Sequence, residues 1–203
     1  SMCDTKTENI KETIAQIKRL EAAGCEIVRV AIPSMRAAAN IKEIKKRIRI
    51  PLVADVHFDP SLALAAIKNG ADKIRINPGN ISNKKDLVEI IKAAKIKSVP
   101  IRIGINGGSF KKAPTPKNLV REAIKNIEFF EANAFDNIVI SIKSSGVKTV
   151  IEANELLYQA MKKRGKLYPI HLGLTEAGPL IPGMAKSIVA MSELLKKGIG
   201  NTI

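Results

Sequence analysis

Charged and polar side chains recur at every second position within short apolar stretches of this 203-residue chain. In residues 72–77, Ile74 and Ile76 alternate with Arg75 and Asn77. Because successive side chains of a β-strand point to opposite sides, each alternation places its polar residues on one face. The same pattern occurs in five further stretches, whose polar faces carry the following residues: Arg29, Asp55, His57, Arg102, Asn106, Ser141, Lys143, His171 and Thr175.

These residue types predict a binding site for a multiply charged anion. Three arginines and one lysine from four strands, aimed at one axis, would repel each other strongly in a low-dielectric interior. The two carboxylates, Asp55 and Glu176, cannot balance four cations, so an anionic ligand should complete the site. Phosphate or diphosphate fits, because arginine offers bidentate donors to phosphate oxygens and lysine adds a point charge. Asn77, Asn106 and Ser141 add neutral donors, and the alternative is a purely structural ion network.

Two glycine-containing turns begin where predicted strands end. They read "NPGN" at residues 77–80 and "NGGS" at residues 106–109. Their glycines permit tight turns and a close approach of a ligand to the backbone, although ordinary loop chemistry also explains them. The chain has neither a Walker A motif nor a GxGxxG motif, so a nucleotide ligand is not indicated.

His57 and His171 are the only histidines, and both fall on polar strand faces. They could donate protons, bind a metal, or position neighbours through hydrogen bonds. With Asp55 and Glu176 nearby a metal is conceivable, but the spacing matches no helical metal motif.

Strands that alternate with helices must position these side chains. Strands are expected at residues 26–32, 51–57, 72–77, 100–106, 137–144 and 168–176, with the beginning of a seventh at 201–203. Helices are expected at residues 7–23, 34–48, 60–69, 84–97, 117–133, 147–164 and 183–197. Repeated strand–helix units connect through right-handed crossovers and build a parallel sheet, either doubly wound or closed into a barrel.

The ends of the chain favour the barrel. The chain opens with a helix and closes as a strand begins, so we expect a strand to be missing at each end. Restoring both gives eight strands, which is the count of a TIM (β/α)8 barrel. The expected fold is therefore an α/β barrel domain over residues 1–203 that lacks its first strand and most of its eighth. Ser1-Met2 is either the end of that first strand or a remnant attached to the chain.

The barrel also explains the alternation. Aliphatic strand faces should pack on the helices, and polar faces should point into the barrel. Most of the polar residues lie in the middle or the C-terminal part of their strand, and barrel enzymes keep their active sites at that rim.

Composition narrows the function classes. The net charge of +15 suggests an anionic partner, but most lysines are expected on solvated helix faces. Aromatic residues make up 3% of the chain and Trp is absent, which disfavours a nucleic-acid-binding module, the non-enzyme alternative. No apolar run approaches the roughly 20 residues that span a bilayer, so no membrane partner is expected. With only Cys3 and Cys25, disulfides do not organise the fold and a cytoplasmic location is expected. Two cysteines also cannot supply the thiolates of an iron–sulfur cluster.

Four long motifs in this order resemble one known family. They are "PLVADVHFDPSLALAAIKNGADKIRINPGNIS" (51–82), "IRIGINGGS" (101–109), "ISIKSS" (140–145) and "HLGLTEAG" (171–178). On these motifs the chain resembles 4-hydroxy-3-methylbut-2-en-1-yl diphosphate synthases, the iron–sulfur enzymes of the methylerythritol phosphate route to isoprenoids. The resemblance runs along essentially all 203 residues.

The resemblance implies a barrel that binds 2-C-methyl-D-erythritol 2,4-cyclodiphosphate. It also implies a separate C-terminal domain that carries a [4Fe–4S] cluster on three cysteines and a glutamate, and a homodimer in which one subunit's cluster domain covers the other's barrel. The implied reaction is a reductive ring opening and dehydration to hydroxymethylbutenyl diphosphate. The two electrons come from ferredoxin or flavodoxin.

Site residues follow from the same motifs. The resemblance implies that the diphosphate is held by Arg29, Arg75, Asn77, Arg102, Asn106 and Lys143. It implies that Asp55 and Glu176 face the carbon skeleton and hydroxyls or help in proton transfer. His57, Ser141 and His171 lie inside the motifs without an assigned role, and Lys186 is either a rim residue near the phosphates or a helix-start lysine.

The departures from the family limit what the chain can do. The cluster domain, the first strand and most of the eighth strand are expected to be absent, so this chain should bind no metal or cluster and should bind the substrate without turning it over. Open strand edges would favour self-association. The alternative enzyme is another phosphate-handling barrel, such as a dihydropteroate-synthase-like transferase, but no motif for a pterin site is visible.

Overall fold

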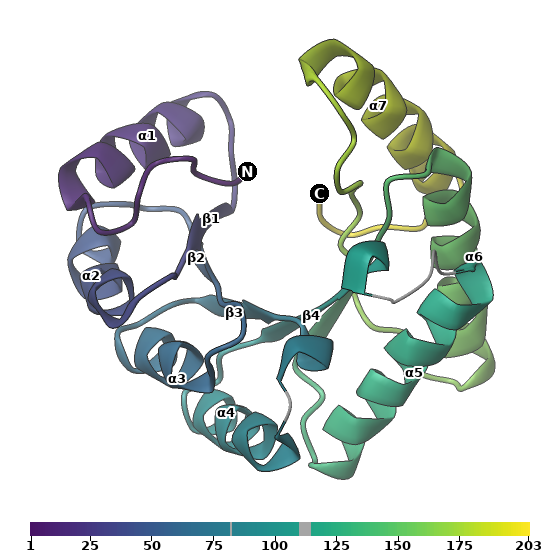
Figure 1. Cartoon of the computed structure of the whole chain (residues 1–203), viewed down its shortest axis with the longest axis horizontal. Helices are drawn as coiled ribbons and strands as arrows, with labels where there is room; N and C mark the ends of the chain where they lie inside the picture. Colours follow the sequence, from purple (N-terminus) through teal and green to yellow (C-terminus); the bar gives the residue numbers. More distant parts are fainter. Residues whose placement is uncertain (82, 110–114) are drawn as a thin grey trace. The chain divides into compact units, whose positions relative to one another are not determined.

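Backbone contacts divide the chain into two compact units, Ser1–Arg102 and Ile103–Ile203. The computed structural model describes residues 1–81, 83–109 and 115–203, so Ser82, the last residue of the first quoted motif, lies outside the described residues. Figure 1 shows the alternation of helices and strands along the chain. Each unit is described by itself, and the expectation of a single barrel domain over residues 1–203 stays a prediction.

The first unit repeats a strand–helix pattern after an opening helix. Its elements, in chain order, are α1 (Ile10–Ala22), β1 (Val28–Ala31), α2 (Met35–Lys45), β2 (Leu52–Asp55), α3 (Pro60–Lys68), β3 (Lys73–Ile76), the short 3-10 helix η1 (Pro78–Asn80), α4 (Lys84–Ile96) and the first residues of β4 (Ile101–Asn106). Strand β2 lies between β1 and β3 and is parallel to both. The register pairs Ala31 with Asp55 and Asp55 with Arg75, which places the ends of the three strands at one edge.

Local sequence explains why these helices start where they do. Side chains that accept hydrogen bonds from the first turn cap α1, α2, α3 and α4, and the capping residues are Asn9, Ser34, Asp59 and Asn83. Pro60 occupies the first turn of α3, where its missing N–H costs nothing. The aliphatic residues of the strands, such as Val30, Ile74 and Ile76, are almost completely buried, as the alternation predicts.

The first residues of the chain pair with β1. Met2 forms a parallel bridge with Arg29. The Arg29 N–H donates to the Ser1 carbonyl at 2.8 Å, and the Cys3 N–H donates to the Arg29 carbonyl at 2.8 Å. Ser1 and Met2 therefore pair with β1, and their interpretation as the end of a first strand stays a prediction.

The second unit continues the pattern. It contains the rest of β4, the short 3-10 helix η2 (Gly107–Ser109), α5 (Pro116–Ala132), β5 (Ile138–Lys143), α6 (Val147–Lys163) and α7 (Leu180–Lys196). Strands β4 and β5 are neighbours in the sheet. Both 3-10 helices occupy the glycine-containing turns that the sequence places after β3 and β4.

The predicted strand at residues 168–176 is wrong as a regular strand. Only two isolated parallel bridges form there, between Ile140 and Ile170 and between His171 and Thr202. The chain then leaves the extended conformation, because Gly173 has φ 157° and Glu176 has φ 53°. A ladder needs consecutive paired residues, and here the pairing stops after one residue on each side.

The last helix starts earlier than the predicted residue 183. It begins at Leu180 and takes in Pro182 and Gly183. A proline in the first turn of a helix removes no intrahelical hydrogen bond, so it does not mark the helix boundary that its presence suggests.

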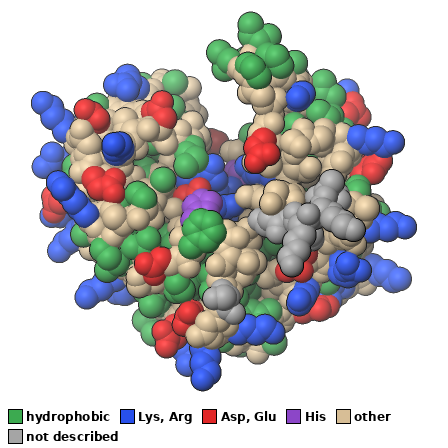
Figure 2. All heavy atoms as spheres, in the orientation of Figure 1, with side chains coloured by type: hydrophobic (Ala, Val, Ile, Leu, Met, Phe, Trp, Pro, Cys, Tyr) green, Lys and Arg blue, Asp and Glu red, His purple; other side chains and the backbone are tan. Residues whose placement is uncertain are grey.

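In the part of the chain that the structure describes, no helix is long and apolar enough to cross a membrane. Figure 2 shows one face of the molecule, where Lys and Arg side chains are scattered over the helices rather than gathered in one patch. This distribution agrees with the interpretation of most lysines as solvated helix residues.

Candidate functional site

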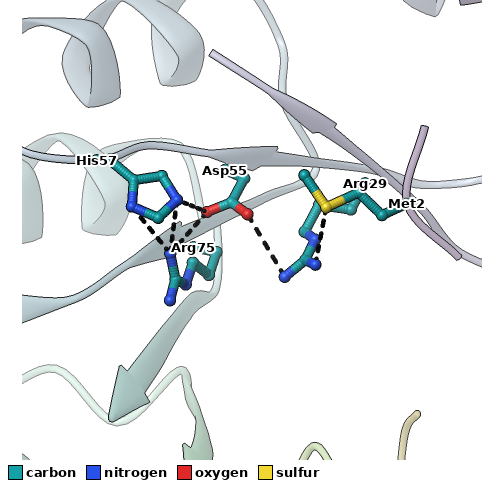
Figure 3. A network of polar contacts seen from close by, with 5 residues as sticks. All are labelled: Met2, Arg29, Asp55, His57 and Arg75. Carbon is teal, nitrogen blue, oxygen red and sulfur yellow. Dashed lines mark hydrogen bonds and ion pairs between the residues drawn. The ribbon is translucent and has the colours of Figure 1, made fainter. Parts of the chain in front are cut away.

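In the first unit, a cluster of charged side chains gathers around Asp55 at the end of β2. The Asp55 carboxylate accepts from Arg75 Nη1 at 3.0 Å through Oδ1, and its Oδ2 lies 3.4 Å from Arg29 Nη1. His57 Nε2 lies 3.3 Å from Oδ1 of the same carboxylate. Figure 3 shows His57 and Arg75 on one side of Asp55 and Arg29 with Met2 on the other. Neighbouring parallel strands thus bring together residues that the sequence alternation assigns to one face.

Arg29 is fixed from two directions. Beside its ion pair with Asp55, its Nη2 lies 2.9 Å from the Met2 sulfur. Burial lowers the pKa of Arg29, and the neighbouring Arg75 lowers it further, whereas Asp55 opposes the shift. The guanidinium is therefore held in place at an electrostatic cost that one carboxylate offsets only in part.

Arg102 in β4 is the cation with the least compensation. Its side chain is only 4% exposed, and its Nε has no hydrogen-bond partner among the described residues. Burial, together with the nearby Arg29 and Arg75 guanidinium groups, lowers the pKa of Arg102 to about 9. Arg102 is still a cation at neutral pH, and among the described residues it forms no ion pair of its own. The nearby Asp55, which already pairs with Arg29 and Arg75, offsets this buried charge only in part.

The pKa of His57 is lowered below its ordinary value, which favours the neutral imidazole. Partial burial lowers its pKa, and Arg75 and Arg29 lower it further, whereas Asp55 raises it. A neutral imidazole can accept a hydrogen bond, and His57 Nε2 lies 2.9 Å from Arg75 Nη1. His57 thus helps to orient the Arg75 guanidinium without adding a further positive charge.

Lys73, the first residue of β3, is a cation that was not singled out in the sequence. It shares the face of Arg75 and Asn77 by the same period of two, and extending the alternation one step toward the start of the strand would have found it. Its pKa is lowered by burial and by Arg102. Among the described residues, this cluster therefore holds four cations, Lys73 and the three arginines, and one carboxylate, Asp55.

We expect that Lys73→Met stabilises the protein. The change removes a half-buried positive charge next to Arg102 and keeps the length of the side chain. The expected gain in unfolding free energy is about 0.5–1 kcal/mol, the size of a partly screened charge pair. Urea denaturation measures it, with Lys68→Met on α3 as an exposed control; a loss of stability larger than that of the control would contradict the repulsion.

Asn77 lies where β3 ends and is 5% exposed. Its side-chain oxygen accepts from the Gly79 N–H at 3.1 Å and so caps η1. A Cβ atom on Gly79 would lie 3.3 Å from that oxygen, which is a tight contact. Glycine therefore lets the turn fold closely against Asn77 at the end of the strand.

In the second unit, Lys143 lies against Gly173, two residues after His171, which with Ile170 forms the two isolated bridges. A Cβ atom on Gly173 would lie 2.7 Å from the Lys143 Nζ, so only glycine leaves room for the ammonium group in this position. His171 is within 2.9 Å of the Thr202 hydroxyl through its Nδ1, and Ser141, two residues before Lys143, is 2% exposed. The structure thus brings Lys143 to Gly173 and gives His171 a partner in Thr202.

The remaining predicted residues of this unit are Asn106 at the end of β4, Glu176 in the turn before α7, and Lys186 in α7. Asn106 is the last residue of β4 and is half-buried. Glu176 is exposed and in a left-handed conformation, and its carboxylate lies near Gly108 of η2, where a Cβ atom would be 3.8 Å from Oε1. Lys186 Nζ donates to the Ala177 carbonyl at 3.1 Å, so Lys186 anchors the turn that contains Glu176.

The donor set of this chain does not fit an iron–sulfur cluster. Among the described residues, no group of three or more His, Cys, Asp or Glu side chains could hold a metal ion. Cys3 is buried, and burial raises the pKa of its thiol to about 11, which disfavours the thiolate that binds iron. The cluster around Asp55 is instead rich in cations, namely Arg29, Arg75 and Arg102.

Comparisons with known proteins show the family of this chain. The family described as "GcpE TIM-barrel domain" matches residues 1–203. The chain is 50% identical over 210 residues to a 4-hydroxy-3-methylbut-2-en-1-yl diphosphate synthase (flavodoxin) of Lysinibacillus sphaericus, and 51% identical to one of Anoxybacillus flavithermus. All of the chain is covered, but only 55% and 56% of these relatives, so the chain spans about half of their length.

Solved structures with a similar fold have different sequences. The match to a dihydropteroate synthase of Xanthomonas albilineans covers 95% of this chain and 78% of the synthase chain, with a TM-score of 0.67 and 18% sequence identity. One of Yersinia pestis covers 94% of this chain and 80% of its own, with a TM-score of 0.67 and 14% identity. At such identities the likeness supports the barrel fold that the strand–helix alternation predicts, and nothing about the ligand.

Proposed function

The chain belongs to the GcpE TIM-barrel domain family, and on that basis we propose that it is the substrate-binding barrel of a 4-hydroxy-3-methylbut-2-en-1-yl diphosphate synthase. In this proposal it binds 2-C-methyl-D-erythritol 2,4-cyclodiphosphate through its inward-facing cations. The full protein then opens the ring of the substrate with two electrons and two protons, and one water leaves. The product is 4-hydroxy-3-methylbut-2-enyl diphosphate, a precursor in isoprenoid biosynthesis.

The observation that carries the proposal is the incompletely compensated charge of Arg102. A protein gains nothing in stability from a buried guanidinium whose charge is offset only in part. A diphosphate, with several negative charges and many acceptor oxygens, would supply partners for Arg102, Arg75 and Arg29 together. The Arg102 guanidinium, which destabilises the free protein, would thus strengthen the binding of the ligand.

Roles for the other site residues come from the family motifs in which they lie. Asn77, Asn106 and Lys143 extend the set of diphosphate donors, and Ser141 is a further neutral donor. Asp55 holds Arg29 and Arg75 in place, and in the proposal Asp55 and Glu176 face the carbon skeleton or assist proton transfer. His57 orients Arg75. His171 and Lys186 stay without an assigned contact to the substrate.

The electron-transfer chemistry must come from elsewhere in the full protein. A [4Fe–4S] cluster would supply the electrons one at a time, but the donors of this chain do not fit it, so its ligands would belong to a part outside residues 1–203. The printed names of the relatives include flavodoxin, which we propose as the electron donor, with ferredoxin as the alternative. A homodimer and a cytoplasmic location are further parts of the proposal.

Calorimetry of the full natural chain with the cyclodiphosphate tests the proposal. Replacing Arg75 and Arg102 together by alanine should weaken binding by at least about 100-fold, because each charge-assisted contact contributes about 1.5–3 kcal/mol. A matched double variant, Arg47→Ala with Arg49→Ala, removes the same charge from exposed positions and should change the affinity less than about threefold. Equal losses in the two variants, or no binding by the parent protein, would refute the proposal.

Neither alternative function is favoured by a specific observation. The similarity to dihydropteroate synthases is one of fold alone. The relatives with about 50% sequence identity are named 4-hydroxy-3-methylbut-2-en-1-yl diphosphate synthases. On the face in Figure 2, the Lys and Arg side chains are scattered and form no continuous track for nucleic acid.

A further inference from the structure

The turn after β2 contains a strained and exposed phenylalanine. Phe58 has φ 64°, a left-handed conformation that is an outlier for a bulky side chain. The Asp59 N–H donates to the His57 carbonyl at 2.7 Å, so Phe58 is the central residue of a tight three-residue turn. A γ-turn closes with a hydrogen bond between residues i and i+2. The form with a positive φ at its central residue is rare and strained.

The surroundings of Phe58 hold this conformation in place. Asp59 caps α3 by accepting from the Ser61 N–H at 2.9 Å and from the Ser61 hydroxyl at 2.7 Å. Pro60 fixes the first turn of the same helix. On the other side, the Val56 N–H donates to the Arg75 carbonyl at 2.9 Å, which keeps the segment on the sheet. Glycine or asparagine would fit this turn with less strain, and yet the position carries a phenylalanine.

Packing does not explain the choice of residue. The Phe58 side chain is 72% exposed, so most of its apolar surface gains nothing from burial in this fold. Phe58 is one of the residues around a crevice that Val56, Ile76 and Ile81 also line, and its ring centroid lies 5.9 Å from that of His57. The apolar ring thus lies beside His57, which contacts Asp55 and Arg75 of the charged cluster.

Exposure and polarity change together along this segment. Asp55 is 3% exposed and lies among the arginines, the His57 side chain is 46% exposed, and Phe58 is 72% exposed. Phe58 directly follows His57 in the turn after β2, so its exposed ring lies beside the end of the strand that carries Asp55. A ligand that fits this gradient has a diphosphate end and a carbon end.

We propose that Phe58 is a specificity-determining residue whose ring contacts the carbon part of an organic diphosphate bound to Arg29, Arg75 and Arg102. The inference rests on the proposed diphosphate-binding function and adds the reason why the site would prefer an organic diphosphate over inorganic diphosphate. The strain at Phe58 is retained because the ring is needed where the ligand's carbon skeleton emerges from the charged cluster. No hydrogen bond is involved, so the preference comes from apolar contact alone.

Two ligands and three variants of the full natural chain test this inference. Calorimetry compares the cyclodiphosphate with inorganic diphosphate for Phe58→Gly, Phe58→Asn and Phe58→Tyr. Glycine and asparagine remove the ring and relieve the turn, so both variants should melt no lower than the parent. Both should bind the cyclodiphosphate roughly tenfold more weakly and inorganic diphosphate within about twofold of the parent. Phe58→Tyr keeps the ring and should retain the preference.

The outcomes separate this inference from the proposed function. Unchanged binding of the cyclodiphosphate by the glycine and asparagine variants overturns the role of Phe58 while leaving the charged cluster intact. Equal weakening of both ligands also overturns it, because the ring would then act on the diphosphate end. A parent protein that binds neither ligand contradicts the proposed function itself.

Discussion

Replacing Asp55 by asparagine is expected to cost about 3–5 kcal/mol of unfolding free energy, the range found when one partner of a buried ion pair is removed. Asp55 is 3% exposed and is the carboxylate that both Arg29 and Arg75 contact. Asparagine keeps the shape of the side chain but removes its charge, so three guanidinium groups would face each other without an anion. Urea denaturation of the full natural chain measures the loss.

Added diphosphate should restore part of this loss. An anion that binds the folded cluster stabilises it by mass action, and the variant without Asp55 has the larger unbalanced charge. The matched control is Asp136→Asn, which removes a carboxylate from an exposed pair with Lys166 and should cost less than about 1 kcal/mol. If Asp55→Asn and Asp136→Asn lose the same free energy, Asp55 does not organise the cluster.

The second large effect has the opposite sign for stability. Arg102→Met is expected to raise the unfolding free energy by about 1–4 kcal/mol, because an apolar side chain of similar length replaces a buried cation whose charge is offset only in part. The same change should weaken binding of the cyclodiphosphate by about 10- to 150-fold, the equivalent of one charge-assisted hydrogen-bonding group. A variant that is more stable and binds less is the signature of a residue kept for its ligand.

The pH dependence of this gain follows from the pKa of Arg102. In the folded protein its pKa is lowered from 12.5 to about 9, so the unfolded chain holds this proton more tightly than the folded one. The penalty of the buried charge is therefore complete below about pH 9 and shrinks as the pH rises through that value. The stability difference between Arg102→Met and the parent should be larger at about pH 8 than at about pH 10. Arg49→Met, an exposed control, should show little difference at either pH, and an Arg102 difference that grows with pH would contradict the cause.

Much of the cluster could be predicted from the period of two. That period assigns Arg75 and Asn77 to one strand face and Arg102 and Asn106 to another, and the structure places Arg29, Arg75 and Arg102 near one carboxylate. Asp55 could not be recognised as the common partner, because strand register, which pairs it with Arg75, is a property of the tertiary fold.

Three other features could be predicted only in part or not at all from the sequence. The predicted strand at residues 168–176 has the right alternation, but alternation does not reveal where pairing stops, and the chain bends at Thr175 and Glu176. Lys73 was missed because it lies at the first position of its strand. The left-handed conformation of Phe58 could not be predicted from the sequence, because phenylalanine is not among the residues that favour such turns.

The charge imbalance around Arg102 has a consequence for the lifetime of the protein in the cell. Degradation by proteases follows the population of open or unfolded chains when opening is fast relative to cleavage. A ligand at 100 times its dissociation constant stabilises the folded state by about 2.7 kcal/mol, which lowers that population roughly 100-fold. A barrel whose electrostatics are completed by its own ligand would therefore be degraded faster when that metabolite runs short, so its abundance would follow the supply of substrate.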